Sequence, residues 1–278
     1  MTINDLKKIQ NFFLETVTSN PNINIHEILE KKEMDIFEKK TAHRLEAYRV
    51  SYYSRISSVF SETIFKLASL LFGKNLIKDF LIEYFYQNPS PNHMEESIRN
   101  FPNFLEEQEE IQECPFVPDF IRLCINISDI LAAPNPNELL LIKNTTTVPQ
   151  PNEIFLQEEH ILLQSQWPIF QMYCSAKNLS ELSELESTTE ELLEEKRIEE
   201  LTSINNTNES ILIFKSCEWS LETILIPEEF ISIMDGLSKK QNIEDAIEQA
   251  DINEDLFDIS KLSNWMSLMT KHSAFMTK

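Results

Sequence analysis

The chain has 278 residues, of which 42% are apolar, a profile typical of a soluble globular protein long enough for one large domain or two ordinary ones. It carries 24 basic and 46 acidic side chains, a net charge of −22, and its 2 glycines are Gly73 and Gly236. So few glycines exclude the GxGxxG and GxxxxGK[ST] phosphate-binding loops and the GxSxG turn of a nucleophilic serine.

The first half of the sequence predicts an all-helical N-terminal domain, residues 1–133. Apolar side chains recur at three- and four-residue steps from Ile3 to Val17, the spacing of an amphipathic helix. The same spacing and the positions of glycine and proline predict further helices after Thr41 and over 64–72, 76–87, 93–99 and 115–133.

The second half predicts a connector over 134–152, where prolines recur, and an α+β domain over 153–278. We expect a strand over 160–164, a short helix over 167–175 and a β-hairpin formed by 209–214 and 221–226. The glutamate-rich range 178–208 predicts an acidic mobile segment with helix at 189–201. Helices are expected after Pro227 and over 243–250 and 256–269, so a short sheet precedes three helices and the domain is predicted to be winged-helix-like. The fold class is therefore mainly α (α+β).

Several stretches resemble one two-domain family. Arg44-Leu-Glu-Ala-Tyr-Arg49 is similar to its RLxxYR signature, and Asn88–Pro91 and Phe101-Pro-Asn-Phe-Leu105 resemble its PPxSP and FPxFL elements. The N-terminal half of this family is described as a DNA-binding domain. Its members include the partner proteins of HvfC/BufC type and of methanobactin maturation. The resemblance implies a non-catalytic subunit that binds a ribosomally made precursor peptide and docks it, as a heterodimer, to a multinuclear iron oxidase.

The richest cluster of candidate docking residues lies in the segment that best matches this family and consists of three arginines and three tyrosines: Arg44, Arg49, Arg55, Tyr48, Tyr52 and Tyr53. Arg44, Tyr48, Tyr52 and Arg55 share one helical side through their spacing of 4, 4 and 3 residues. We predict that they form the docking surface for the oxidase. Two alternatives stay open: internal pairing of the arginines with Glu46, Glu83 or main-chain oxygens, and contact with a nucleic acid.

The hairpin is the candidate peptide-binding site. A sheet edge exposes main-chain donors and acceptors, to which an extended peptide can add as a further strand. The six residues predicted to line the site are Ile211, Ile213, Lys215, Leu221, Thr223 and Leu225. The alternative is that about half of these side chains face the core, because successive strand residues point to opposite faces.

Catalysis, metal and cofactor are not expected, since the sequence shows neither a nucleophile–base pair nor a short spacing of ligands. The four cysteines lie far apart and are expected to be buried free thiols. The N-terminus has no apolar signal region and no stretch is long enough for a membrane span, so we expect a cytoplasmic protein without a membrane partner.

Two other functions stay open. One is a DNA-binding transcriptional regulator and the other a general protein-interaction module. A nucleic acid is not expected as a partner, because duplex binding needs a basic face and the helices expected over 228–237 and 243–250 carry no lysine or arginine.

Overall fold

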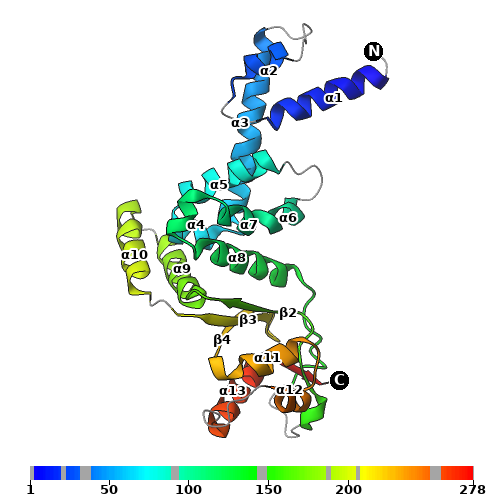
Figure 1. The fold of residues 1–278 in the computed structure, drawn as a ribbon, viewed down its shortest axis with the longest axis vertical. Helices are drawn as coiled ribbons and strands as arrows, with labels where there is room; N and C mark the ends of the chain where they lie inside the picture. Colours follow the sequence, from blue (N-terminus) through cyan, green and yellow to red (C-terminus); the bar gives the residue numbers. More distant parts are fainter. Residues whose placement is uncertain are drawn as a thin grey trace. The chain divides into compact units, whose positions relative to one another are not determined.

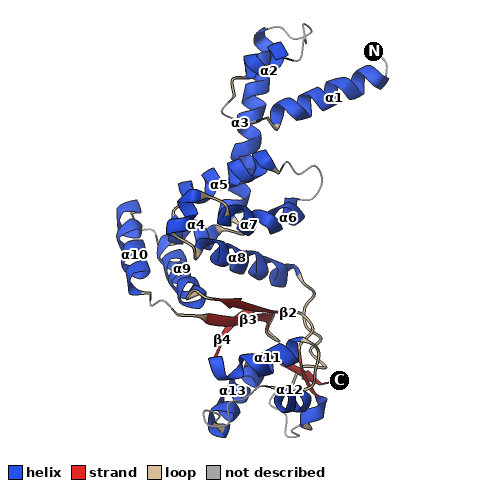
Figure 2. Cartoon of the chain, viewed as in Figure 1, coloured by secondary structure: helices blue, strands red, loops and turns tan. Residues whose placement is uncertain are grey.

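The computed structural model describes residues 3–19, 23–31, 39–88, 94–142, 149–185, 189–204, 207–250 and 258–277. The chain forms two compact units, 1–118 and 119–278. The first is helical, and the second combines helices with small antiparallel sheets, which confirms the mainly α, α+β class (Figures 1 and 2).

The first unit consists of short and medium helices that follow the predicted pattern closely. The α-helices are α1 (Ile3–Val17), α2 (Ile25–Lys31), α3 (Lys39–Glu62), α4 (Lys66–Phe72), α5 (Lys74–Gln87), α6 (Met94–Ser97) and α7 (Phe101–Glu106), with 3₁₀ turns at Ile98–Asn100 and Glu109–Glu113. Helix α2 was not predicted, and the FPxFL element lies within helix α7.

Aromatic rings make the core between α3, α5 and α7. The Phe60 and Phe85 rings stack with their centroids 5.4 Å apart, and Tyr84 meets Phe101 edge to face at 5.3 Å. All four side chains are buried, and the Tyr84 hydroxyl donates to the Ser97 carbonyl. Phe101 belongs to the FPxFL element, so that part of the resemblance coincides with core packing.

Gly73 joins α4 to α5 in a conformation that other residues avoid. Its φ of 98° lies in the left-handed half of the map, where a Cβ is strained. We predict that Gly73→Ala lowers the free energy of unfolding by about 1–3 kcal/mol. Urea titration beside Asn75→Ala, at an exposed position of α5, measures this; equal stability of the two variants would contradict it.

The second unit begins within helix α8. Its helices are α8 (Val117–Ala132), α9 (Ile169–Ser183), α10 (Glu190–Ser203), α11 (Ile231–Ser238), α12 (Ile243–Gln249) and α13 (Ile259–Lys271), and its strands are β1 (Ile154–Leu156), β2 (His160–Ser165), β3 (Glu209–Lys215), β4 (Leu221–Ile226) and β5 (Phe275–Thr277). The unit boundary at 118 differs from the predicted one at 133. Helix α8 belongs with the strands, since Asp119 accepts a hydrogen bond from Ser165 and Ala133 accepts one from Lys215.

The larger sheet has the antiparallel order β2-β3-β4. One face packs against the C-terminal helices in a buried cluster that includes Leu212, Phe214, Ile224, Ile226, Phe230, Ile233, Met234 and Trp265. Helices α8 and α9 lie along the other face (Figure 1). The sheet is thus the middle layer of this unit. Strands β1 and β5 form a second, unpredicted pair, and Leu141 bridges to Met276.

Two expectations for the acidic and cysteine-bearing segments need correction. Helix α9 continues to Ser183 because Leu179 is buried, so the predicted mobile segment does not begin at 178. The helix expected at 189–201 is confirmed as α10, whose N-cap is Thr189. The four cysteines are free; Cys124 is buried, but Cys174 is exposed.

The elements expected in the C-terminal domain, a short sheet followed by three helices, are present, while its winged-helix identity stays a prediction. Among the described residues, no helix combines the length and apolar character needed to cross a membrane.

Candidate functional sites

The six predicted peptide-binding residues form three neighbouring pairs across the hairpin. In the antiparallel register Ile211 faces Leu225, Ile213 faces Thr223, and Lys215 faces Leu221. Since side chains alternate along a strand, all six point to one face of the sheet. The structure therefore brings the set together.

The β3 half of this prediction is wrong. Strand β3 lies between β2 and β4, so its main-chain groups are paired on both sides and offer no edge. Ile211 and Ile213 are fully buried, and Lys215 is 6% exposed. The Lys215 ammonium donates to the Ala133 carbonyl and to Asn135 Oδ1, 3.4 Å away. These three residues are structural.

Strand β4 retains the properties of a docking edge. It pairs with β3 on one side and with no other described strand. Leu221 and Thr223 are half-buried and Leu225 is 41% exposed. The Thr223 side chain lies close to Tyr173 of α9, whose pKa is raised mainly by burial. A peptide would therefore meet the main chain of β4 and Leu225 more than the Thr223 hydroxyl.

The predicted docking residues lie together on the outer side of α3. Arg44 and Arg55 are exposed, Tyr48 is 58% exposed and Tyr52 is half-buried. The Tyr48 ring meets Phe13 of α1 edge to face, with centroids 5.5 Å apart. Neither arginine forms an ion pair with a described residue. We call Arg44, Tyr48, Tyr52 and Arg55 the α3 stripe.

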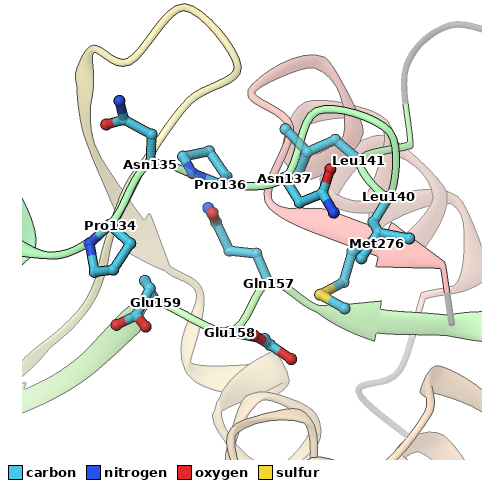
Figure 3. Close-up of a pocket in the computed structure, with 10 residues that line it drawn as sticks. All are labelled: Pro134, Asn135, Pro136, Asn137, Leu140, Leu141, Gln157, Glu158, Glu159 and Met276. Atoms are coloured by element: carbon cyan, nitrogen blue, oxygen red, sulfur yellow. The ribbon is translucent and has the colours of Figure 1, made fainter.

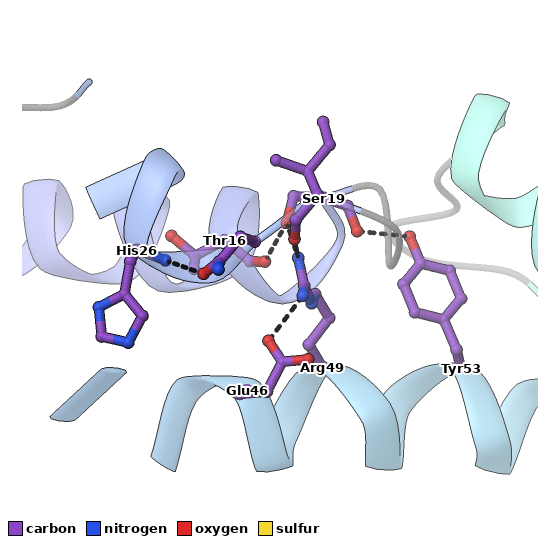
Figure 4. A network of polar contacts seen from close by, with 8 residues as sticks. Thr16, Ser19, His26, Glu46, Arg49 and Tyr53 are labelled. Carbon is purple, nitrogen blue, oxygen red and sulfur yellow. Dashed lines mark hydrogen bonds and ion pairs between the residues drawn. The ribbon is translucent and has the colours of Figure 1, made fainter. Parts of the chain in front are cut away.

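Internal pairing, the alternative reading of this cluster, is correct for Arg49. This side chain is 2% exposed and donates to the Ile23 carbonyl (2.7 Å), Ser19 Oγ (3.3 Å) and Glu46 Oε2 (2.6 Å). Figure 4 shows Arg49 between Glu46 and Ser19. The guanidinium thus binds the chain just beyond the C-terminal end of α1, where a positive charge is favourable.

Tyr53 completes this contact, because its hydroxyl donates to the Thr18 carbonyl at 2.9 Å. Figure 4 shows the same hydroxyl beside Ser19, whose carbonyl lies 3.3 Å away. Burial raises the pKa of Tyr53 to about 12. Since this folded-state pKa lies above the unfolded value, Tyr53 stabilises the fold below pH 10, and the contribution falls as the pH rises from 10 to 12. We predict that Tyr53→Phe costs about 1 kcal/mol at pH 7 and that the difference from the unmutated chain shrinks above pH 10. Urea unfolding across pH 8–11.5 measures it, and a pH-independent difference would contradict it.

A pocket that sequence reasoning did not find lies beside the connector, with a volume of about 220 Å³. Its walls come from the connector, the β1–β2 turn and β5, and its ten lining residues are Pro134, Asn135, Pro136, Asn137, Leu140, Leu141, Gln157, Glu158, Glu159 and Met276 (Figure 3). We call it the Gln157 pocket. In the sequence, only the prolines and the Glu158-Glu159 pair stand out among these residues. Neither predicts that the connector, the β1–β2 turn and β5 come together.

No group of three or more His, Cys, Asp or Glu among the described residues is placed to hold a metal ion. No protein-family model matches the chain, and no curated protein matches it.

Proposed function

We propose that this chain is a non-catalytic partner subunit that captures an extended precursor peptide along the edge of β4 and docks it to a multinuclear iron oxidase. The observation that carries the proposal is the position of β4. It is an edge strand of the sheet, and its side chains Leu221, Thr223 and Leu225 are half-buried or exposed. The neighbouring strand β3 is buried. Such an edge offers main-chain hydrogen bonds to any extended segment, and side chains such as Leu225 add selectivity.

The α3 stripe supports the second half of the proposal. Two exposed arginines beside two tyrosines on one helix are the residue types that interfaces use most. These residues lie in the first unit and β4 lies in the second. Partner docking and peptide capture therefore use separate surfaces, and each can be removed without the other.

A DNA-binding regulator of winged-helix type is the second candidate, and the charges of helices α11 and α12 disfavour it. Helices α11 and α12 contain no lysine or arginine, while α12 has Glu244 and Asp245 in its first turn. A recognition helix needs basic side chains to reach phosphates. A general protein-interaction module without a peptide substrate is the third candidate, and it would need only the α3 stripe.

Reconstitution tests these candidates against one another. The probes are an iron oxidase and a short cysteine-containing peptide, which the proposal expects to be encoded beside the gene for this chain. We expect the chain to co-elute with the oxidase and to bind the peptide. Nanomolar, sequence-dependent retention of duplex DNA at physiological salt would contradict the proposal. A gene neighbourhood without such an oxidase and peptide would contradict it too.

A further inference from the structure

The Gln157 pocket contains a buried acceptor that the protein leaves without a donor. We propose that this pocket binds the cationic end of a basic peptide side chain, the guanidinium of arginine or the ammonium of lysine. This assignment rests on the proposed function, since it names the residue type of the captured peptide that the pocket takes.

Gln157 carries the argument. It is 2% exposed, and its Oε1 is buried without a hydrogen-bond partner among the described atoms. Its Nε2 donates to the Lys215 carbonyl at 3.1 Å, and its main-chain N–H donates to the Ala274 carbonyl at 2.9 Å. Rotating the amide by half a turn would set Oε1 against the Lys215 oxygen, so the contact fixes which atom stays open. A buried amide oxygen without a donor is destabilising, which favours a ligand that supplies one.

The other amides of the pocket are already engaged. Asn135 Oδ1 accepts from the Lys215 ammonium, and Asn137 Oδ1 accepts from the Leu139 N–H at 3.2 Å. Figure 3 shows the Gln157 side chain extending from the β1–β2 turn toward Pro136. Among the side-chain amides of this pocket, Gln157 Oε1 is therefore the buried acceptor that has no donor among the described residues.

Charge and shape decide the class of ligand. Glu158 and Glu159, both exposed, are among the lining residues and make the surroundings of the pocket acidic, and no described basic residue lines it. Leu140, Leu141 and Met276 provide an apolar wall. The volume of about 220 Å³ exceeds the roughly 150 Å³ that holds a benzene ring, so an organic group fits and not only one water. An alkyl chain that ends in a positively charged group with several donors fits the apolar wall, the acidic lining residues and the volume of the pocket.

The same cation can come from a peptide or from a free amine, and three small probes separate these sources. Nα-acetylarginine N-methylamide represents a residue within a chain, butylguanidinium a free cation, and the matching citrulline derivative a neutral control of the same shape. The readout is the NMR signal of the ¹³C-labelled methionine methyl groups of the full-length chain. Met276 lines the pocket, whereas Met234, buried in the C-terminal core, is the internal reference.

We expect the arginine derivative to shift Met276 and not Met234, with the citrulline derivative weaker by about tenfold or more. Gln157→Met should weaken binding by about tenfold, and Glu158→Gln or Glu159→Gln by about threefold each, more at low salt than at high. Glu248→Gln, an exposed carboxylate on α12, is the matched control and should change nothing.

Three results would overturn the assignment. The first is that the arginine derivative does not shift Met276, and the second is that the citrulline derivative binds as tightly as the arginine derivative. The third is that butylguanidinium binds and the arginine derivative does not. The last would mean that the pocket takes a free cation. Since Glu158→Gln and Glu159→Gln alter exposed side chains, they test the idea even where Gln157→Met fails to fold. Failure here leaves peptide capture along β4 intact, because that capture is measured at a different strand.

Discussion

Thr223→Pro is expected to weaken binding of the precursor peptide by about tenfold or more. Strand addition depends on main-chain hydrogen bonds worth about 1 kcal/mol each, and proline both removes a donor and bends an edge strand. Isothermal titration with the synthetic precursor peptide measures the loss. Association with the oxidase, which involves the other unit, should remain.

Two variants make this test specific. Thr223→Val removes the hydroxyl that contacts Tyr173 but keeps the N–H, and it should bind the peptide almost normally. Along an antiparallel strand the N–H groups point alternately to the neighbouring strand and to the open edge. Glu222→Pro therefore removes an N–H that points the opposite way from that of Thr223. One of the two prolines should destabilise the sheet, and the other should abolish capture with little change in stability. Two stable variants with normal peptide binding would contradict capture along β4.

Arg55→Glu is expected to weaken association with the iron oxidase by tenfold to about a hundredfold while leaving peptide binding unchanged. Arg55 is exposed and lies in line with Tyr48 and Tyr52, so its reversal places a repulsive charge within the proposed interface. Truncating one interface arginine commonly costs more than about 2 kcal/mol, and reversal adds like-charge repulsion. Analytical size exclusion at two salt concentrations measures the effect.

Lys271→Glu is the matched control for this charge change, because Lys271 is an exposed lysine at the end of α13 in the other unit. It alters the net charge equally and should leave the complex intact. Equal weakening by both variants would show a general effect of charge. Normal association of Arg55→Glu would exclude the α3 stripe as the docking surface.

Local pattern was enough to predict most of the helices and the hairpin. The three- and four-residue steps of α1, the glycine after α4 and the β-branched and apolar runs of β3 and β4 are signals contained within short windows. Helix α9 runs past its predicted end because burial of Leu179 stabilises its C-terminal turns. The composition of these turns alone had predicted a mobile segment. The β1–β5 pair was missed because each strand has three residues and its partner lies more than 100 positions away in the sequence.

The candidate sites were less predictable from the sequence than the helices and strands. The spacing of Arg44, Tyr48, Tyr52 and Arg55 was sufficient to place them on one helical side. The same spacing sets Arg49 and Tyr53 on a different side, but it did not indicate that this side faces the end of α1. A hairpin pattern also does not indicate which strand has a second neighbour, so β3 was assigned to an edge that pairing with β2 removes. The Gln157 pocket depends on contacts between distant segments, and these have no local signature.

Hydrogen exchange of the β4 amides, with and without the precursor peptide, tests the central claim most directly. If the peptide adds to the edge of β4, exchange within 221–226 slows on binding, and the helices of the first unit keep their rates. Unchanged exchange over 221–226, with protection instead confined to the C-terminal helices α11 to α13, would contradict capture by strand addition.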